Sequence, residues 1–283
     1  MEVETVSEQL LFTTTYIESS FPKEKTSGTG FLYLSATDAG NQLFLVTNRH
    51  VVEDNSRGGQ ANKLVVKFIK ADADGKPDLG KFTYVNFDEF TLSHWIGHPD
   101  PEIDLVIIPI GRYVEALNKM GQNPYFKYLT KDIVFQVGAN PELDALEEVL
   151  FVGYPNGLFD AVNHLPLFRR GITASSVNID FDGKPNFIID AGVYPGSSGS
   201  PVFIHDQGWI RDRKGNVSND SRTILLGIIS KTYFRTTDAE IAEDTVALSA
   251  KVQEIIGLGI VIKARCIHET INAHLKNAGL TEV

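Results

Sequence analysis

Short apolar runs rich in Val, Ile and Phe recur along the chain, and clusters of Gly, Pro, Asn and Asp separate them. Such runs are typical of β-strands, and the clusters between them are typical of turns. Many short strands favour a barrel or a sandwich over a sheet whose strands alternate with helices. The sequence therefore predicts an all-β fold with strands at Gly30–Ser35, Leu43–Thr47, Lys63–Ile69, Leu105–Ile110, Val149–Gly153, Gly171–Ser176, Phe187–Asp190, Pro201–Ile204, Ile224–Ser230 and Leu258–Lys263.

Helix signals are few. Val114–Met120 predicts a short helix, and Glu142–Glu148 predicts about one helical turn. The tail Arg265–Ala278 has apolar residues at helical spacing and is followed by Gly279, so it predicts an amphipathic helix that packs on the body. Val6–Ile17 carries signals for both a buried segment and a strand, and its state stays open.

Composition excludes several classes of protein. The 283 residues are 42% hydrophobic, which predicts a folded core and not a disordered chain. A formal net charge of −10 disfavours general binding to nucleic acid or to an anionic membrane surface. No apolar run is long enough to span a bilayer.

The setting of the protein is inferred from its cysteine content and its N-terminus. A single cysteine, Cys266, excludes an intrachain disulfide and predicts a reducing compartment. Because Cys266 falls in the predicted tail helix, we expect it to be a small buried hydrophobic residue and not a nucleophile. The acidic N-terminus lacks the features of a signal peptide, so we expect a cytoplasmic protein, although a signal removed beforehand would leave no trace.

The segment Gly196-Ser197-Ser198-Gly199-Ser200-Pro201 follows a predicted strand and brackets serine with glycine. Glycine adopts backbone conformations closed to other residues, so such a turn can present a serine hydroxyl and aim backbone N–H groups at one point. This is the geometry that acyl transfer needs. Taken alone, the motif is equally compatible with an ordinary turn.

A serine hydroxyl becomes a good nucleophile only when a base takes its proton and an acid orients that base. His50 comes just beyond the apolar run that ends at Thr47, on a rigid support. Asp104 stands at the head of an apolar run, where a carboxylate is costly to bury without a partner. An imidazole N–H would supply that partner.

In this order, four blocks resemble those of trypsin-like (chymotrypsin-fold) serine peptidases: Gly28-Thr29-Gly30-Phe31, Val46-Thr47-Asn48-Arg49-His50-Val51-Val52, Asp104-Leu105-Val106-Ile107 and Gly196–Pro201. Three further blocks are similar to the bacterial HtrA-like branch, namely Val152–Leu158, Gly227–Ser230 and Gly257–Lys263. The order His, Asp, Ser is that of the chymotrypsin group. We expect no PDZ-like module after the last block.

The resemblance implies two six-stranded antiparallel β-barrels and a C-terminal helix, with residues 1–130 and 131–283 as the two halves of one peptidase domain. It also implies that His50 is the general base, Asp104 its orienting acid and Ser198 the nucleophile. The backbone N–H groups of Gly196 and Ser198 would form the oxyanion hole. Ser230 matches a strand residue beside the bound substrate.

Departures from the family pattern bear on activation and specificity. Ser197 stands where the digestive enzymes carry an activating aspartate, so activation by that route is not expected. In this chain, Gly192 stands at the position that sets the preference for basic residues in trypsin. Gly259 stands at the matching pocket position in the last strand. A pocket floored by glycines predicts an apolar substrate side chain and no preference for Arg or Lys.

The sequence therefore predicts a serine endopeptidase that acts on polypeptides through an acyl-enzyme and needs no metal or cofactor. A catalytically silent or gated peptide-binding module and an esterase stay open as alternatives. A regulatory partner is possible, and the polar loop Asp206–Arg222 is the candidate for gating. His94 and His98 could suggest a metal pair, but Gly97 and Pro99 interrupt any helix there and surface positions are expected.

Overall fold

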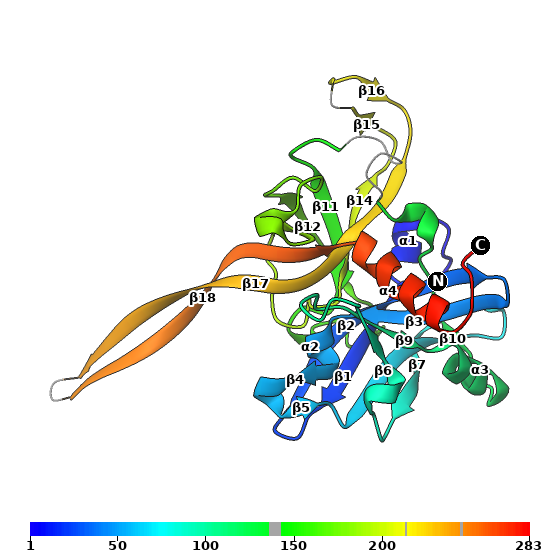
Figure 1. The fold of residues 1–283 in the computed structure, drawn as a ribbon, viewed down its shortest axis with the longest axis horizontal. Coiled ribbons are helices and arrows are strands. Elements are labelled where there is room, and N and C mark those ends of the chain that lie inside the picture. Colours follow the sequence, from blue (N-terminus) through cyan, green and yellow to red (C-terminus); the bar gives the residue numbers. More distant parts are fainter. Residues whose placement is uncertain (136–142, 213, 244–245) are drawn as a thin grey trace.

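Two β-structures lie one above the other, and a long two-stranded ribbon leaves the body to one side (Figure 1). The computed structural model describes residues 1–135, 143–212, 214–243 and 246–283, and between 237 and 253 it describes the backbone alone.

The N-terminal sheet has eight strands with antiparallel pairing in the order β10-β6-β1-β2-β3-β9-β8, and β7 also pairs with β6. The predicted closure of this half into a barrel is not seen among the described residues. The strands at the two ends of the path, β8 and β10, are two residues long and do not pair with each other. The strands are β1 (Thr14–Ser20), β2 (Lys25–Thr37), β3 (Gly40–Thr47), β6 (Lys63–Ala71), β7 (Pro77–Phe87), β8 (Ile96–Gly97), β9 (Val106–Pro109) and β10 (Pro124–Tyr125).

The apolar runs Phe31–Leu34 of β2, Leu43–Val46 of β3 and Val106–Ile108 of β9 are largely buried on both faces, which explains why they do not alternate with polar residues. Successive side chains of a strand point to opposite faces. Phe44 and Val46 belong to a core cluster shared with the second half of the chain, whereas Leu45 belongs to the cluster inside the N-terminal sheet. The two clusters fix the register of β3, because a slip of one residue would exchange the two sets.

The C-terminal half forms a closed six-stranded barrel in the order β11-β12-β13-β18-β17-β14. A third apolar cluster, which includes Phe151 and Phe187, fills its interior. The prediction of an all-β fold with a six-stranded barrel and a C-terminal helix is confirmed for this half. The strands are β11 (Glu148–Gly153), β12 (Leu167–Thr173), β13 (Asn186–Asp190), β14 (Pro201–Asp206), β17 (Arg222–Glu243) and β18 (Val246–Lys263).

Only the inner ends of β17 and β18 belong to the barrel. Their outer parts, residues 231–243 and 246–257, form the ribbon seen at the left of Figure 1, which we call the arm. Pairing continues from Thr232, opposite Gly259, to Glu243, opposite Val246. The sequence predicted strands only for Ile224–Ser230 and Leu258–Lys263, because the arm is rich in Thr, Ala and Glu and lacks a strong strand pattern.

Four α-helices are present among the described residues: α1 (Val6–Leu10), α2 (Arg49–Val52), α3 (Gly111–Lys119) and α4 (Arg265–Asn277). The ambiguous N-terminal segment divides into α1 and β1. The turn predicted at Glu142–Glu148 is wrong for residues 143–148, which carry no helix, and residue 142 lies outside the described residues. None of these helices is long and apolar enough to cross a bilayer.

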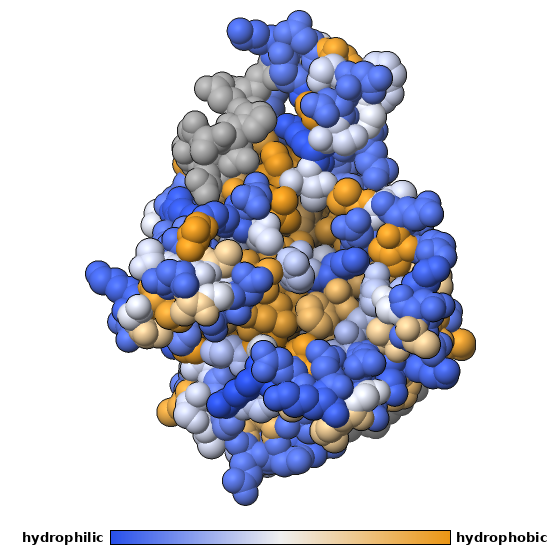
Figure 2. All heavy atoms as spheres, turned by 90° about the vertical axis from the view of Figure 1, so that its right-hand side faces the viewer, coloured by the Kyte–Doolittle hydropathy of each residue, from blue (hydrophilic) through white to orange (hydrophobic). Residues whose placement is uncertain are grey.

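Helix α4 closes the cluster shared by the two halves. Cys266, Ile267, Ile271 and Leu275 are buried there, together with Phe31 of β2. Figure 2 shows the face opposite the arm, where hydrophobic side chains gather across the middle between two largely hydrophilic ends.

Burial raises the pKa of the Cys266 thiol to about 12, so the prediction of a buried, unreactive cysteine is confirmed.

The remaining elements are short. The predicted loop Asp206–Arg222 holds the hairpin of β15 (Ile210–Arg211) and β16 (Val217–Ser218), at the end of β14 opposite to Ser198. The others are β4 (Glu53–Asp54), β5 (Gly59–Gln60) and 3-10 turns at Asn55–Arg57, Leu92–His94, Lys131–Ile133, Pro155–Gly157 and Phe181–Gly183.

Candidate active site

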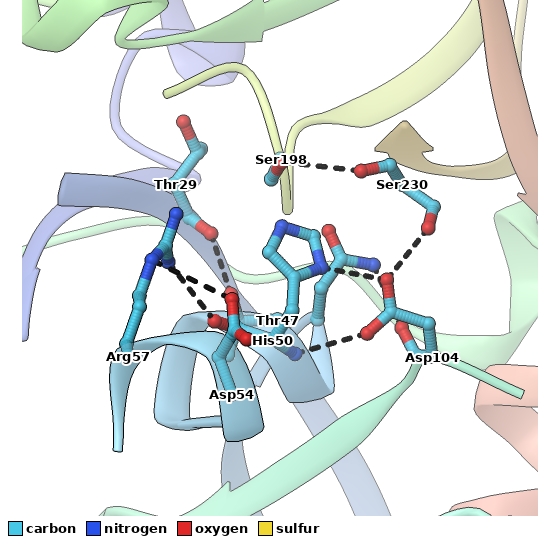
Figure 3. Close-up of polar contacts among 9 residues, drawn as sticks. Thr29, Thr47, His50, Asp54, Arg57, Asp104, Ser198 and Ser230 are labelled. Carbon is cyan, nitrogen blue, oxygen red and sulfur yellow. Dashed lines mark hydrogen bonds and ion pairs between the residues drawn. The ribbon is translucent and has the colours of Figure 1, made fainter. Parts of the chain in front are cut away.

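His50 and Asp104 meet at the edge of the N-terminal sheet. Strand β3 ends at Thr47, and α2 then turns the chain so that His50 faces the segment before β9. The Asp104 carboxylate contacts His50 twice, through Oδ2 to the ring Nδ1 at 2.7 Å and through Oδ1 to the backbone N–H at 3.0 Å. Figure 3 shows the His50 ring between Asp104 and Ser198. These two contacts fix the orientation of the ring, and the role of Asp104 as the orienting acid stays a prediction.

Ser230 supplies a further contact that the sequence did not predict. Its hydroxyl donates to Asp104 Oδ2 at 2.7 Å, and the side chain is almost fully buried. Burial alone would raise the pKa of Asp104, but the hydrogen bonds and charge of His50 and the bond from Ser230 outweigh it and hold that pKa below its usual value. Asp104 thus stays ionised beside the imidazole.

The hydroxyl of Ser198 is turned away from this pair. It donates to the backbone carbonyl of Ser230 at 3.1 Å, and no hydrogen bond joins it to His50 among the described residues. Transfer of its proton to His50 requires rotation of the serine side chain toward the ring.

The turn before Ser198 depends on glycine. Gly196 has φ of +84°, and a Cβ at this position would lie 2.6 Å from the Tyr154 carbonyl oxygen. The Pro195 carbonyl accepts from the Asn156 N–H at 2.5 Å. Because C=O and N–H point in opposite directions across a trans peptide, this bond aims the Gly196 N–H away from Asn156.

Two backbone donors of this turn are available. The N–H groups of Gly196 and Ser198 donate to no protein acceptor within the part of the chain that is described. Free N–H groups beside a serine hydroxyl can bind an oxyanion.

Two threonines join the turn to the N-terminal sheet. The Thr29 N–H donates to the Ser198 carbonyl at 2.8 Å, and its hydroxyl donates to the Gly196 carbonyl at 3.0 Å. The Thr47 hydroxyl in turn donates to the Thr29 carbonyl at 2.8 Å. Apart from the small residues around Thr29, no sequence pattern indicates these roles.

An open pocket of 440 Å³ contains both His50 and Ser198 in its lining. Segments from both halves of the molecule form its walls, including the base of the arm: Thr26, Ser27, His50, Val51, Arg57, Val193–Gly196, Ser198, Ser230–Thr232 and Phe234. Gly192 directly precedes Val193 in this wall. Gly259 packs against Val193, because a Cβ at Gly259 would lie 2.5 Å from Val193 Cγ2. The loop Asp206–Arg222 contributes no described residue to the lining, which does not support its predicted role as a gate.

One group of metal-ligating atoms lies elsewhere. Atoms of His98, Cys266 and Glu269 come within 4.8 Å of one another in the described part of the chain. His98 is buried, and not at the surface as predicted. Its ring already bonds to the Asp100 N–H through Nδ1 at 3.0 Å and to Glu269 through Nε2 at 3.0 Å, so we assign no metal to it.

Comparison with known proteins identifies the family of the chain and agrees with its fold. Residues 28–210 match the family model described as a trypsin-like peptidase domain. No curated protein matches the chain. Among solved structures, the thermostable serine protease AL20 from an extremophilic microorganism has a TM-score of 0.51 at 12% identity, over 93% of this chain and 97% of that one.

Two other solved structures are similar over nearly their whole length. Protease Anisep from Arthrobacter nicotinovorans has a TM-score of 0.46 at 13% identity, over 94% of this chain and 96% of that one. An inactivated protease paralogue of the scabies mite has a TM-score of 0.46 at 12% identity, over 98% of both chains. The predicted closeness to the HtrA-like branch stays a prediction. Because the family match spans more than half of the chain and contains His50, Asp104 and Ser198, the protein belongs to the family of trypsin-like peptidase domains.

Proposed function

We propose that the protein is a serine endopeptidase in which Ser198 attacks a peptide carbonyl and His50 takes the serine proton. The observation that carries the proposal is the fixed pair of His50 and Asp104 at 2.7 Å, in the same pocket as Ser198. The ionised carboxylate stabilises the imidazolium that forms when His50 accepts the proton. The two halves, residues 1–130 and 131–283, act as one peptidase domain because they share a core and a pocket.

The reaction proceeds in two stages. As the Ser198 oxygen bonds to the substrate carbonyl carbon, the N–H groups of Gly196 and Ser198 bind the oxyanion. His50 then protonates the leaving amine, and the carbonyl re-forms as an acyl-enzyme. Water, deprotonated by His50, hydrolyses this ester and restores the serine hydroxyl.

Substitution Asp104→Asn tests the role of the carboxylate. We expect kcat to fall by roughly 10³- to 10⁴-fold, because an amide cannot stabilise imidazolium and favours the wrong ring tautomer. The measurement is steady-state hydrolysis of a quenched fluorescent peptide. Asp54→Asn is the matched control, since this carboxylate lies near His50 but bonds to Ser56 and Arg57. An equal loss in both variants would contradict the proposal.

The lowered pKa of Asp104 also predicts how stability depends on pH. A carboxyl group whose pKa is lower in the folded state adds stability above its unfolded pKa of about 3.9, and this is lost as pH falls through the folded pKa. The free energy of unfolding in urea, measured for wild type and Asp104→Asn between pH 3 and 7, should therefore differ less between the two proteins as the pH falls. A difference in free energy of unfolding that does not change with pH would mean that the Asp104 charge adds no stability.

A gated peptide-binding module is the second candidate, and the bond from the Ser198 hydroxyl to the Ser230 carbonyl favours it. A fluorophosphonate probe distinguishes the two, because it labels only a serine whose base is engaged. We expect label on wild type and none on Ser198→Ala or His50→Ala. A folded wild type that takes no label would favour the module.

A further inference from the structure

An arginine behind the pocket wall has no charge partner in the part of the chain that the structure describes. The guanidinium of Arg169, in β12, stacks on the ring of Tyr194 with Cζ 5.0 Å from the ring centroid. It forms no hydrogen bond and no ion pair with any residue that the structure describes, whereas its neighbour Arg170 pairs with Glu148. A half-buried guanidinium with five free N–H donors is a strong site for a carboxylate.

The position of this guanidinium depends on Gly192. A Cβ at Gly192 would meet Arg169 Nη2 at 2.5 Å, so the arginine occupies the space that another side chain at this position would fill. Gly192 leads directly into Val193 and Tyr194, which line the pocket with Ser198. The cation therefore lies against the wall that a substrate side chain next to Ser198 would approach.

The charges around the pocket are complementary to an acidic ligand. Its described lining includes Arg57 and Lys231 but no carboxylate, in a protein of net charge −10. Glu24 and Asp54 neutralise Arg57, whereas Lys231 has no ion-pair partner among the described residues. Asp190, two residues before Gly192, forms no ion pair with Arg169.

We propose that Arg169 selects a substrate with glutamate or aspartate at the residue whose carbonyl Ser198 attacks. This inference rests on the proposed peptidase function. A fork of parallel N–H donors matches a carboxylate in a bidentate pair, which an amide or an apolar group cannot replace. This preference for an acidic residue replaces the expectation of an apolar substrate side chain, because Arg169 and Val193 fill the space that Gly192 and Gly259 leave.

The test compares peptides that differ only in the residue before the cut, namely Glu, Gln, Phe or Lys. We expect wild type to hydrolyse the Glu peptide with a kcat/KM about 10- to 100-fold above that for Gln, as for a charge-assisted pair. Arg169→Gln should bring this ratio close to one, and Arg169→Lys should retain part of it. Arg169→Glu should favour Lys over Glu. Arg170→Gln is the matched control and should keep the wild-type ratio.

Binding of the same four peptides to Ser198→Ala, measured by fluorescence anisotropy, separates this inference from the proposed function. Tighter binding of the Glu peptide that is lost on adding Arg169→Gln supports the role of Arg169, even if wild type hydrolyses nothing. Hydrolysis without a preference for Glu, or a preference that survives Arg169→Gln, overturns the inference and leaves the peptidase function standing. If a variant unfolds, the ratio of the wild-type kcat/KM values for the Glu and Gln peptides alone decides whether the inference stands.

Discussion

Ser198→Ala is expected to lower kcat for peptide hydrolysis by about 10⁶-fold, the size of effect seen when a nucleophile that works as a unit with its base is removed. His50→Ala should cost about as much, and the double variant should be no slower than either single one. The physical reason is that each residue is useless to the acyl-enzyme route without the other. Residual activity would come from binding and the free N–H groups of Gly196 and Ser198.

The control for this experiment is Ser200→Ala, two residues further along the same turn. The Ser200 hydroxyl is buried and has no hydrogen-bond partner in the described structure, so its removal leaves no other group unpaired. We expect kcat and the thermal midpoint to stay close to wild type. Activity of Ser198→Ala within tenfold of wild type, in protein free of contaminating protease, would refute the assignment of Ser198 as the nucleophile.

The sequence predicted catalytic residues where residue type and order form a pattern, and their catalytic roles stay predictions. His50, Asp104 and Ser198 stand beside apolar strands or glycines, and those neighbours dictate their placement. The sequence did not predict the Ser230 hydroxyl on Asp104 or Thr29 on the Ser198 turn. These bonds join residues more than a hundred positions apart, and a serine or threonine in a strand carries no local sign of such a partner.

The errors in the predicted fold have a similar cause. Strand propensity found the inner ends of β17 and β18, where burial selects Ile, Leu and Val, and failed in the arm, where the two strands support each other through backbone pairing. Nothing in the local sequence distinguishes Arg169 from its neighbour Arg170. The contact of Arg169 with Gly192 arises because β12 pairs with β13, which ends two residues before Gly192, and this pairing depends on the barrel and not on the local sequence.

Gly199→Ala is expected to cause the largest loss of stability among single methyl additions in the turn. Gly199 has φ of +91°, and its Cβ would overlap the Thr29 carbonyl, which also accepts from Thr47. The strained backbone alone costs about 1–2 kcal/mol. The overlap would in addition force the turn away from β2 and break the bond from the Thr29 N–H to the Ser198 carbonyl, for a total of about 3 kcal/mol or more.

Gly183→Ala isolates the two contributions, because Gly183 has φ of +69° and no atom within 4 Å of the position of its Cβ. Urea unfolding should place Gly183→Ala about 1–2 kcal/mol below wild type, from backbone strain alone. Gly199→Ala should lie well below that and should also lose labelling by the fluorophosphonate, since displacement of the turn moves Ser198 away from His50. Equal losses of stability in the two variants, with labelling intact, would mean that the contact between the turn and β2 is not what positions the nucleophile.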